Sequence, residues 1–157
     1  MHSGHEKWLA SCSQIGFVPE VQSFPEGTAT SKDAASALRC DIGQIAKSIL
    51  FVCEGQSLLV VTSGKNRVDR KKKLKHLIGK KPSQASPEFV LEHTGYIVGG
   101  VPPFGHEQYI LTFVDEDLMN YDLLWAAAGS PQTVFPIHPR ALLDRTGGTL
   151  ADIKQTR

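Results

Sequence analysis

The chain alternates between short apolar runs and polar breaks that contain glycine or proline, and this pattern predicts short strands. The apolar runs are rich in β-branched and aromatic residues, as strands usually are. The break Glu54-Gly55-Gln56-Ser57 predicts a turn, so the runs on either side of it are expected to form a hairpin. The predicted extended segments are 18–24, 48–53, 58–62, 109–114, 123–128 and 133–137.

Other segments have residues at their boundaries that start or end helices. Thr30 or Ser31 is a good N-cap for one of them, and Pro87 suits the first position of another. Gly79 can end the longest. The predicted helices are 8–15, 31–39, 67–78, 87–93 and 139–145.

Strands and helices do not alternate regularly along the chain, which indicates the α+β class rather than a parallel α/β fold. The hairpin connection implies a sheet that is mixed or mostly antiparallel. A chain of 157 residues suits one compact domain that spans positions 1–157.

Several classes of protein lose support from what the sequence lacks. No apolar run approaches the roughly 20 residues of a membrane-spanning helix, and the first eight residues have no signal-peptide pattern. The three cysteines form no CxxC pair, and no two histidines have HExxH spacing. Serine hydrolase, P-loop and Rossmann motifs are missing too. We therefore expect a cytoplasmic protein with no membrane contact and no metal site.

A net charge of +1 hides one concentrated basic segment at 65–81. The segment contains nine Lys and Arg residues and one acidic residue, so it carries +8, while eight basic and fifteen acidic residues give the remainder −7. It is either a solvated helix face or a surface that binds a polyanion. Because no aromatic residue stands among the lysines, we expect phosphate contacts rather than base stacking.

Lys47 precedes the apolar run at 48–53. Side chains alternate along a strand, so Lys47 should share a face with Ile49, Phe51 and Cys53. A cation beside buried apolar residues is costly unless an electron-rich group meets it. The alternative is a strand-end lysine whose stem is covered and whose ammonium reaches water. Strand geometry alone favours this alternative.

A loop with two adjacent glycines and two adjacent prolines follows more than fifty residues later. The prolines lack N–H groups and restrict the backbone before them, so the N–H groups of Gly99, Gly100 and Val101 could point outward. Such donors can bind an anion or the oxyanion of a reacting ester. A rigid structural turn is the alternative, and the motif by itself favours it.

Two further polar residues are candidates for a site. His106 directly follows the glycine-proline loop, and Asp115 ends the predicted 109–114 strand, where pockets often open. Asp115 could equally be the N-cap of the following turn.

These segments, in this order, resemble the YbaK/ProX family of editing domains that are associated with prolyl-tRNA synthetase. The resemblance runs roughly from Phe24 to Leu143, and its most specific part is a lysine before an apolar strand followed by a Gly-x-x-x-Pro loop. The matching segments are 28–35, 45–51, 66–72, 95–105, Asp115 and 126–129.

The resemblance implies a stand-alone aminoacyl-tRNA deacylase that acts in trans and has a compact α+β fold with a mixed, barrel-like sheet and short surrounding helices. It implies no metal and no organic cofactor. Aminoacyl-tRNA would be the partner, and an aminoacyl-tRNA synthetase is a second candidate.

The residues expected at the site follow from the match and from the pattern together. Lys47 matches the family's key functional residue, and 99–103 matches its substrate loop. The expected catalytic residues are Lys47, Gly99 and Gly100. The expected substrate contacts are Phe24, Thr28, Ile49, Phe51, Val101, Pro103, Phe104, His106 and Asp115. The expected tRNA contacts are Arg67, Arg70, Lys71, Lys72, Lys73 and Lys75.

The expected reaction is hydrolysis of a small amino acid from the terminal ribose of tRNA. Lys47 would bind the ester carbonyl or the terminal phosphate, and water or a ribose hydroxyl would supply the attacking or proton-relaying group. One alternative is a non-catalytic module that binds tRNA or a synthetase, which the basic segment would support. Another is a hydrolase of a different small ester or amide. The sequence leaves open which amino acid is removed.

Overall fold

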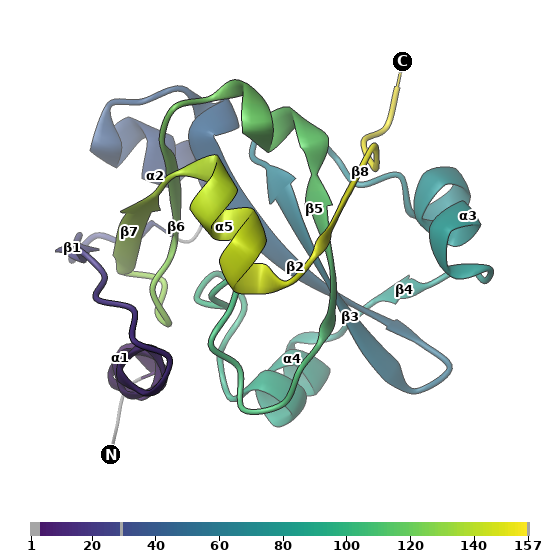
Figure 1. Cartoon of the computed structure of the whole chain (residues 1–157), viewed down its shortest axis with the longest axis horizontal. Helices are drawn as coiled ribbons and strands as arrows, with labels where there is room; N and C mark the ends of the chain where they lie inside the picture. The colour runs from purple at the N-terminus through teal and green to yellow at the C-terminus, as the bar shows by residue number, and fades with distance from the viewer. Residues whose placement is uncertain (1–3, 29, 157) are drawn as a thin grey trace.

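The protein folds around one mixed, eight-stranded sheet, shown in Figure 1; the computed structural model describes residues 4–28 and 30–156. The strand order is β1-β7-β6-β2-β3-β5-β8, and β4 pairs with β2 outside this path. The strands are β1 (Gln22–Ser23), β2 (Ile45–Cys53), β3 (Gln56–Ser63), β4 (Ser83–Gln84), β5 (Leu111–Asp115), β6 (Leu124–Ala127), β7 (Thr133–Ile137) and β8 (Thr149–Ala151).

The predicted hairpin is confirmed as β2 and β3, at the centre of the sheet. Glu54 and Gly55 connect the two strands with φ angles of 51° and 80°. These positive angles are the ones a two-residue type I′ turn requires. Because only two residues form the turn, β3 begins two residues earlier than predicted, and β2 is longer than predicted at its other end, where it begins at Ile45. Of the seven pairings between described strands, four are antiparallel and three parallel, so the sheet is mixed, as predicted.

The helices surround the sheet, and α2 and α4 begin where the sequence predicted. The Thr30 hydroxyl accepts the N–H of Asp33 at the start of α2, and the Ser86 hydroxyl accepts the N–H of Phe89 at the start of α4. No described helix is long and apolar enough to span a membrane. The helices are α1 (Gly4–Gln14), η1 (Ile42–Gln44), α2 (Ser31–Leu38), η2 (Arg70–Leu74), α3 (Lys75–Ile78), α4 (Pro87–Thr94), η3 (Glu116–Asn120) and α5 (Pro139–Thr146).

The predicted 67–78 helix was wrong at its start. Val68 forms an isolated β-bridge with the C-terminal tail, and the Asp69 N–H donates to the Ile153 carbonyl. These contacts hold the chain extended up to Asp69. The helix then begins as the π turn η2, in which the Leu74 N–H reaches back five residues to the Asp69 carbonyl. The tail, for which the pattern predicted no element, therefore moves the helix start.

Other predicted boundaries differ from the structure, and the predicted 8–15 helix begins four residues earlier, at Gly4. In the predicted 18–24 strand only Gln22–Ser23 forms a strand, so most of that segment is a connection. The predicted 109–114 strand begins two residues later, at Leu111. The two-residue β4 was not predicted at all, because two polar residues carry no periodicity.

The second edge of β2 has two neighbours with a gap between them. β6 pairs with Ile45 and Ala46, and β4 pairs with Phe51 and Val52. Between these two neighbours, residues 47–49 form backbone pairs only with β3, on the other edge of β2, among the described residues. An uncovered strand edge presents unpaired N–H and C=O groups. This gap positions the site described next.

Candidate functional site

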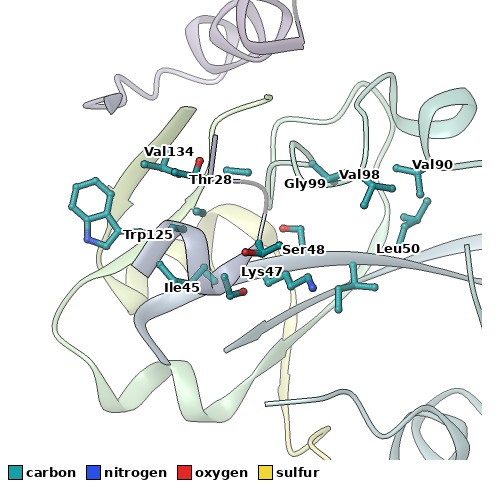
Figure 2. A pocket seen from close by; sticks show the side chains of 18 of the residues that line it. Thr28, Ile45, Lys47, Ser48, Leu50, Val90, Val98, Gly99, Trp125 and Val134 are labelled. Carbon is teal, nitrogen blue, oxygen red and sulfur yellow. The ribbon is translucent and has the colours of Figure 1, made fainter. Parts of the chain in front are cut away.

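A cavity of about 310 Å³ opens at the gap in the sheet, beside the uncovered stretch of β2. Its walls come from α2, β2, β4, α4, the 98–101 segment, β6 and β7. Figure 2 shows Thr28 and Val134 on one side of the cavity and Val90, Val98 and Gly99 on the other. This volume is at the small end of the range for ligand sites.

Lys47 is the one titratable side chain among the described residues that line the cavity. It is the third residue of β2 rather than a strand end, and its side chain is exposed. On its face of the sheet, α2 packs on Ile45 and η2 packs on Phe51, so Lys47 lies between two covered positions. Within the described part of the chain it has no hydrogen-bond or ion-pair partner. The cation is therefore free to meet a ligand.

The glycine pair of the loop forms a tight turn at the cavity wall. The Gly100 N–H donates to the Ile97 carbonyl at 2.9 Å, and Gly99 has the φ of 89° that the third position of a type II turn requires. A Cβ on Gly100 would lie 2.8 Å from the Ser130 Cα, so that position accepts only glycine without a shift. Because the Gly100 N–H closes the turn, it is not available to a substrate. The N–H groups of Gly99 and Val101 have no partner among the described residues, and both residues line the cavity.

Two side-chain hydrogen bonds hold the remainder of the loop in place. The Trp8 Nε1–H donates to the Phe104 carbonyl at 2.9 Å, and the His106 Nε2–H donates to the Pro102 carbonyl at 2.9 Å. The fold thus fixes the loop by its carbonyls, and the N–H groups of Gly99 and Val101 stay unpaired among the described residues.

His106 lies outside the cavity lining and acts on the loop. Its burial lowers the pKa of the imidazole below the usual 6.5, so the ring is neutral at pH 7. The Nδ1 atom is buried and has no partner among the described residues. We expected His106 to contact substrate; the structure places it outside the cavity lining, where its hydrogen bond holds the loop.

Asp115 is fully buried and also lies outside the cavity lining. Its Oδ2 accepts from the Thr62 hydroxyl at 3.2 Å, the Ser63 N–H at 3.0 Å and the Asn66 Nδ2 at 2.8 Å. Its Oδ1 accepts from the Asp117 N–H at 3.0 Å, as an N-cap does. Of the two alternatives from the sequence, the structure thus shows the cap, and the carboxylate fastens the end of β3 to the start of η3.

Four other expected substrate contacts do not line the cavity. Phe51 packs in the apolar cluster around Leu74, on the other side of β2 from the loop. Phe104 packs against Trp8 in the aromatic core, and Pro103 is buried. Phe24 lines a separate surface hollow. The expected contacts that do line the cavity are Thr28, Ile49 and Val101.

Two cavity-lining serines were not predicted, Ser31 and Ser48. Ser48 stands next to Lys47 in the sequence, and strand alternation places it on the opposite face. The uncovered edge of β2 brings both faces to one cavity. Pairing between distant segments creates this edge, so periodicity alone gives no signal for it.

The basic segment has a free part and an occupied part. Lys73 pairs with Asp152 at 2.9 Å, Lys80 pairs with Glu54, and the Arg70 guanidinium donates to a carbonyl. The side chains that are exposed and lack a partner among the described residues are Arg67, Lys71, Lys72, Lys75 and Lys81. Leu74 packs in the Phe51 cluster, which places this helix on the sheet face that carries Lys47.

The lining offers no acid, base or thiol besides Lys47 among the described residues. The described residues contain no group of three or more His, Cys, Asp or Glu side chains placed to hold a metal ion. Cys12 is buried in the core, and burial raises the pKa of its thiol to about 11, which makes it a poor nucleophile. Polar chemistry in the cavity therefore rests on one ammonium, backbone groups and hydroxyls.

Comparison with known proteins identifies relatives over most of the chain. The chain is 34% identical over 124 residues, 78% of each protein, to the uncharacterized protein YwhH of Bacillus subtilis (strain 168). It is 39% identical to a solved structure described as a candidate trans-editing enzyme for prolyl tRNA synthetase, with a TM-score of 0.92 over 99% of both chains. It is 28% identical to the hypothetical protein APE2540, with a TM-score of 0.86 over 95% of this chain and 99% of that one.

The family model of the aminoacyl-tRNA editing domain matches residues 25–144. This range contains all the elements that line the cavity, from α2 to β7. It also agrees with the resemblance predicted from the lysine and the glycine-proline loop. The chain belongs to the aminoacyl-tRNA editing domain family.

Proposed function

We propose that this protein is a deacylase that removes a small amino acid from the 3′ end of mischarged tRNA. One observation carries the proposal: Lys47, a cation with no partner among the described residues, lines a small cavity in a chain of the editing-domain family. The relative described as a candidate trans-editing enzyme supports the same activity.

The proposed reaction is ester hydrolysis. A water oxygen bonds to the carbonyl carbon, a tetrahedral oxyanion forms, and the bond from that carbon to the ribose oxygen breaks. The ribose oxygen takes a proton, which leaves a free amino acid and an uncharged tRNA. Lys47 and the N–H groups of Gly99 and Val101 are the donors that can stabilise the oxyanion. The turn is rigid, so little reorganisation is needed when the charge develops.

The proton that leaves the attacking water needs an acceptor, and the described lining contains no carboxylate or imidazole to take it. A hydroxyl of the substrate's own ribose can relay this proton. The protein's part is then to hold the ester, supply charge stabilisation and exclude bulky acyl groups. Discrimination by size alone gives about 10- to 200-fold per methylene.

The free cations of η2 and α3 support a role in holding tRNA. These cations lie on the sheet face that carries Lys47. η2 covers Phe51, which lies four residues from Lys47 along β2, a separation of about 13 Å. Lysines at this distance can contact phosphates near the 3′ end while the ester occupies the cavity.

The test is a panel of tRNAs, each charged with one small amino acid and incubated with purified protein. We expect at least one to be deacylated far faster than without protein, and free amino-acid esters to be poor substrates. If all decay at the spontaneous rate with protein in molar excess, the proposal fails. Faster hydrolysis of the free esters would instead indicate a general esterase.

A non-catalytic tRNA-binding module is the second candidate, and the unpaired lysines of η2 and α3 favour it. It predicts tight tRNA binding without turnover. In that case Lys47→Ala would leave binding and function intact, while replacing Lys71 and Lys72 would abolish binding.

A further inference from the structure

The hydroxyl groups around the cavity fall into two kinds. The Thr28 hydroxyl donates to the Pro131 carbonyl at 3.0 Å, and the Thr30 hydroxyl caps α2, so the fold uses both. The hydroxyl oxygens of Ser31 and Ser48 are buried and have no partner among the described residues. Buried polar atoms without partners are uncommon in folded proteins. Two of them in one cavity lining therefore point to a ligand.

The backbone groups of Ser48 are also available to a ligand. The Ile45 carbonyl accepts the Gly64 N–H on the β3 side, and the Leu50 carbonyl accepts the Ala85 N–H on the other side. Backbone groups of alternate residues point to the same edge of a strand, so the N–H and C=O of Ser48 point with those of Leu50 into the gap. Neither has a partner among the described residues. Ser48 thus offers one hydroxyl, one donor and one acceptor at the same place.

A strand edge of this kind binds the main-chain groups of an added residue. The ester of an amino acid has such groups, an ammonium that donates and a carbonyl that accepts. An aminoacyl group held on the edge at Ser48 has its side chain among the lining residues. These include the unpaired hydroxyls together with small apolar side chains such as Ala46 and Ala126.

A hydroxyl-bearing side chain and a methyl side chain differ sharply in such a site. The first can pair with an unpaired serine, whereas the second leaves it without a partner. Sites built to bind a substrate hydroxyl discriminate against the analogue that lacks it much more strongly than size can. We propose that Ser48, assisted by Ser31, recognises a side-chain hydroxyl, so that the cavity selects seryl or threonyl esters over alanyl esters. This inference rests on the proposed function.

The experiment compares one tRNA charged with serine and with alanine, because these acyl groups differ by a single hydroxyl. We expect the wild-type protein to deacylate the seryl form about tenfold faster or more. Ser48→Ala should bring this ratio close to one, mainly by slowing the seryl reaction, and Ser31→Ala should lower it by a smaller factor. Since neither hydroxyl bonds within the described fold, both variants should melt at nearly the wild-type temperature.

Ser57→Ala is the matched control, since Ser57 lies on the neighbouring strand β3 and does not line the cavity. It should leave the ratio unchanged. A wild-type protein that removes alanine as fast as serine, or a Ser48→Ala variant that keeps the wild-type ratio, overturns the inference.

Binding of non-hydrolysable seryl- and alanyl-adenosine amides separates this inference from the proposed function. If no aminoacyl-tRNA of the panel is hydrolysed, the proposed function fails, and the amides still test Ser48. Tighter binding of the seryl amide that is lost in Ser48→Ala supports the inference, while equal binding of both amides contradicts it.

Discussion

The surroundings of Asp115 and the cavity at Lys47 are both polar regions at the ends or edges of central strands, yet they differ in how their polar groups are used. Around Asp115, one buried carboxylate accepts four hydrogen bonds from its neighbours. At the cavity, Lys47, Ser31 and Ser48 have side chains with no partner among the described residues. Polar groups that the fold satisfies hold the structure, and those that it leaves unpaired are available to a ligand.

Lys47→Ala tests the cavity side of this comparison and should have the largest effect. Loss of one preorganised charge at an oxyanion lowers rates by about 100- to 1000-fold. Because Lys47 has no partner within the described fold, the melting temperature should hardly change. Single-turnover deacylation together with thermal unfolding measures both quantities. Lys32→Ala, at an exposed position of α2 away from the cavity lining, should retain the wild-type rate.

Asp115→Ala tests the other region of this comparison, the surroundings of Asp115. It leaves several buried donors without an acceptor, so we expect the free energy of unfolding to fall by about 3 kcal/mol in urea titrations. The folded fraction should still hydrolyse its substrate at close to the wild-type rate. A variant of normal stability that has lost turnover would place Asp115 in the reaction and erase the contrast between the two regions.

The free cations of the basic segment are unpaired, as Lys47 is, so we expect them to be available to a ligand. Replacing Lys71, Lys72 and Lys75 with Gln should raise KM for aminoacyl-tRNA about tenfold and leave kcat unchanged. The slope of log affinity against log salt should fall by about 2, because each phosphate contact contributes roughly 0.7–0.9. An unchanged slope would mean that tRNA binds elsewhere. Lys32→Gln is the control for a lost surface charge.

His106→Gln should give the smallest effect and tests the support of the loop. The folded pKa of His106 lies below 6.5, so its stabilising contribution is complete above that pH and is lost as the pH falls toward the folded pKa. The stability of the wild type should therefore decline more steeply than that of the variant between pH 7.5 and pH 5.5. Thermal unfolding at several pH values measures this, and parallel curves would contradict it.

Local chemistry made much of the fold predictable. The β2–β3 hairpin, the cap at Thr30, the start of α4 at Pro87 and the 133–137 strand all depend on residues close together in the sequence. The late start of η2 was not predictable, because the C-terminal tail holds the chain extended up to Asp69.

The site was predictable in part. Strand geometry and the loop motif alone favoured structural roles for Lys47 and Gly99, and the family resemblance made them site candidates; both line the cavity. Ser48 was missed because its exposure to the cavity depends on the gap between β4 and β6, which are about forty residues apart in the chain. Asp115 was expected at the substrate because a carboxylate at a strand end fits a pocket and a cap equally well.

The most direct test of the proposed deacylation is the first-order rate at which excess protein removes a small amino acid from mischarged tRNA. For at least one amino acid we expect the wild-type protein to exceed the spontaneous rate by about 100-fold or more, and folded Lys47→Ala to come close to the spontaneous rate. A wild-type protein that never exceeds the spontaneous rate, or a Lys47→Ala variant as fast as the wild type, would contradict it.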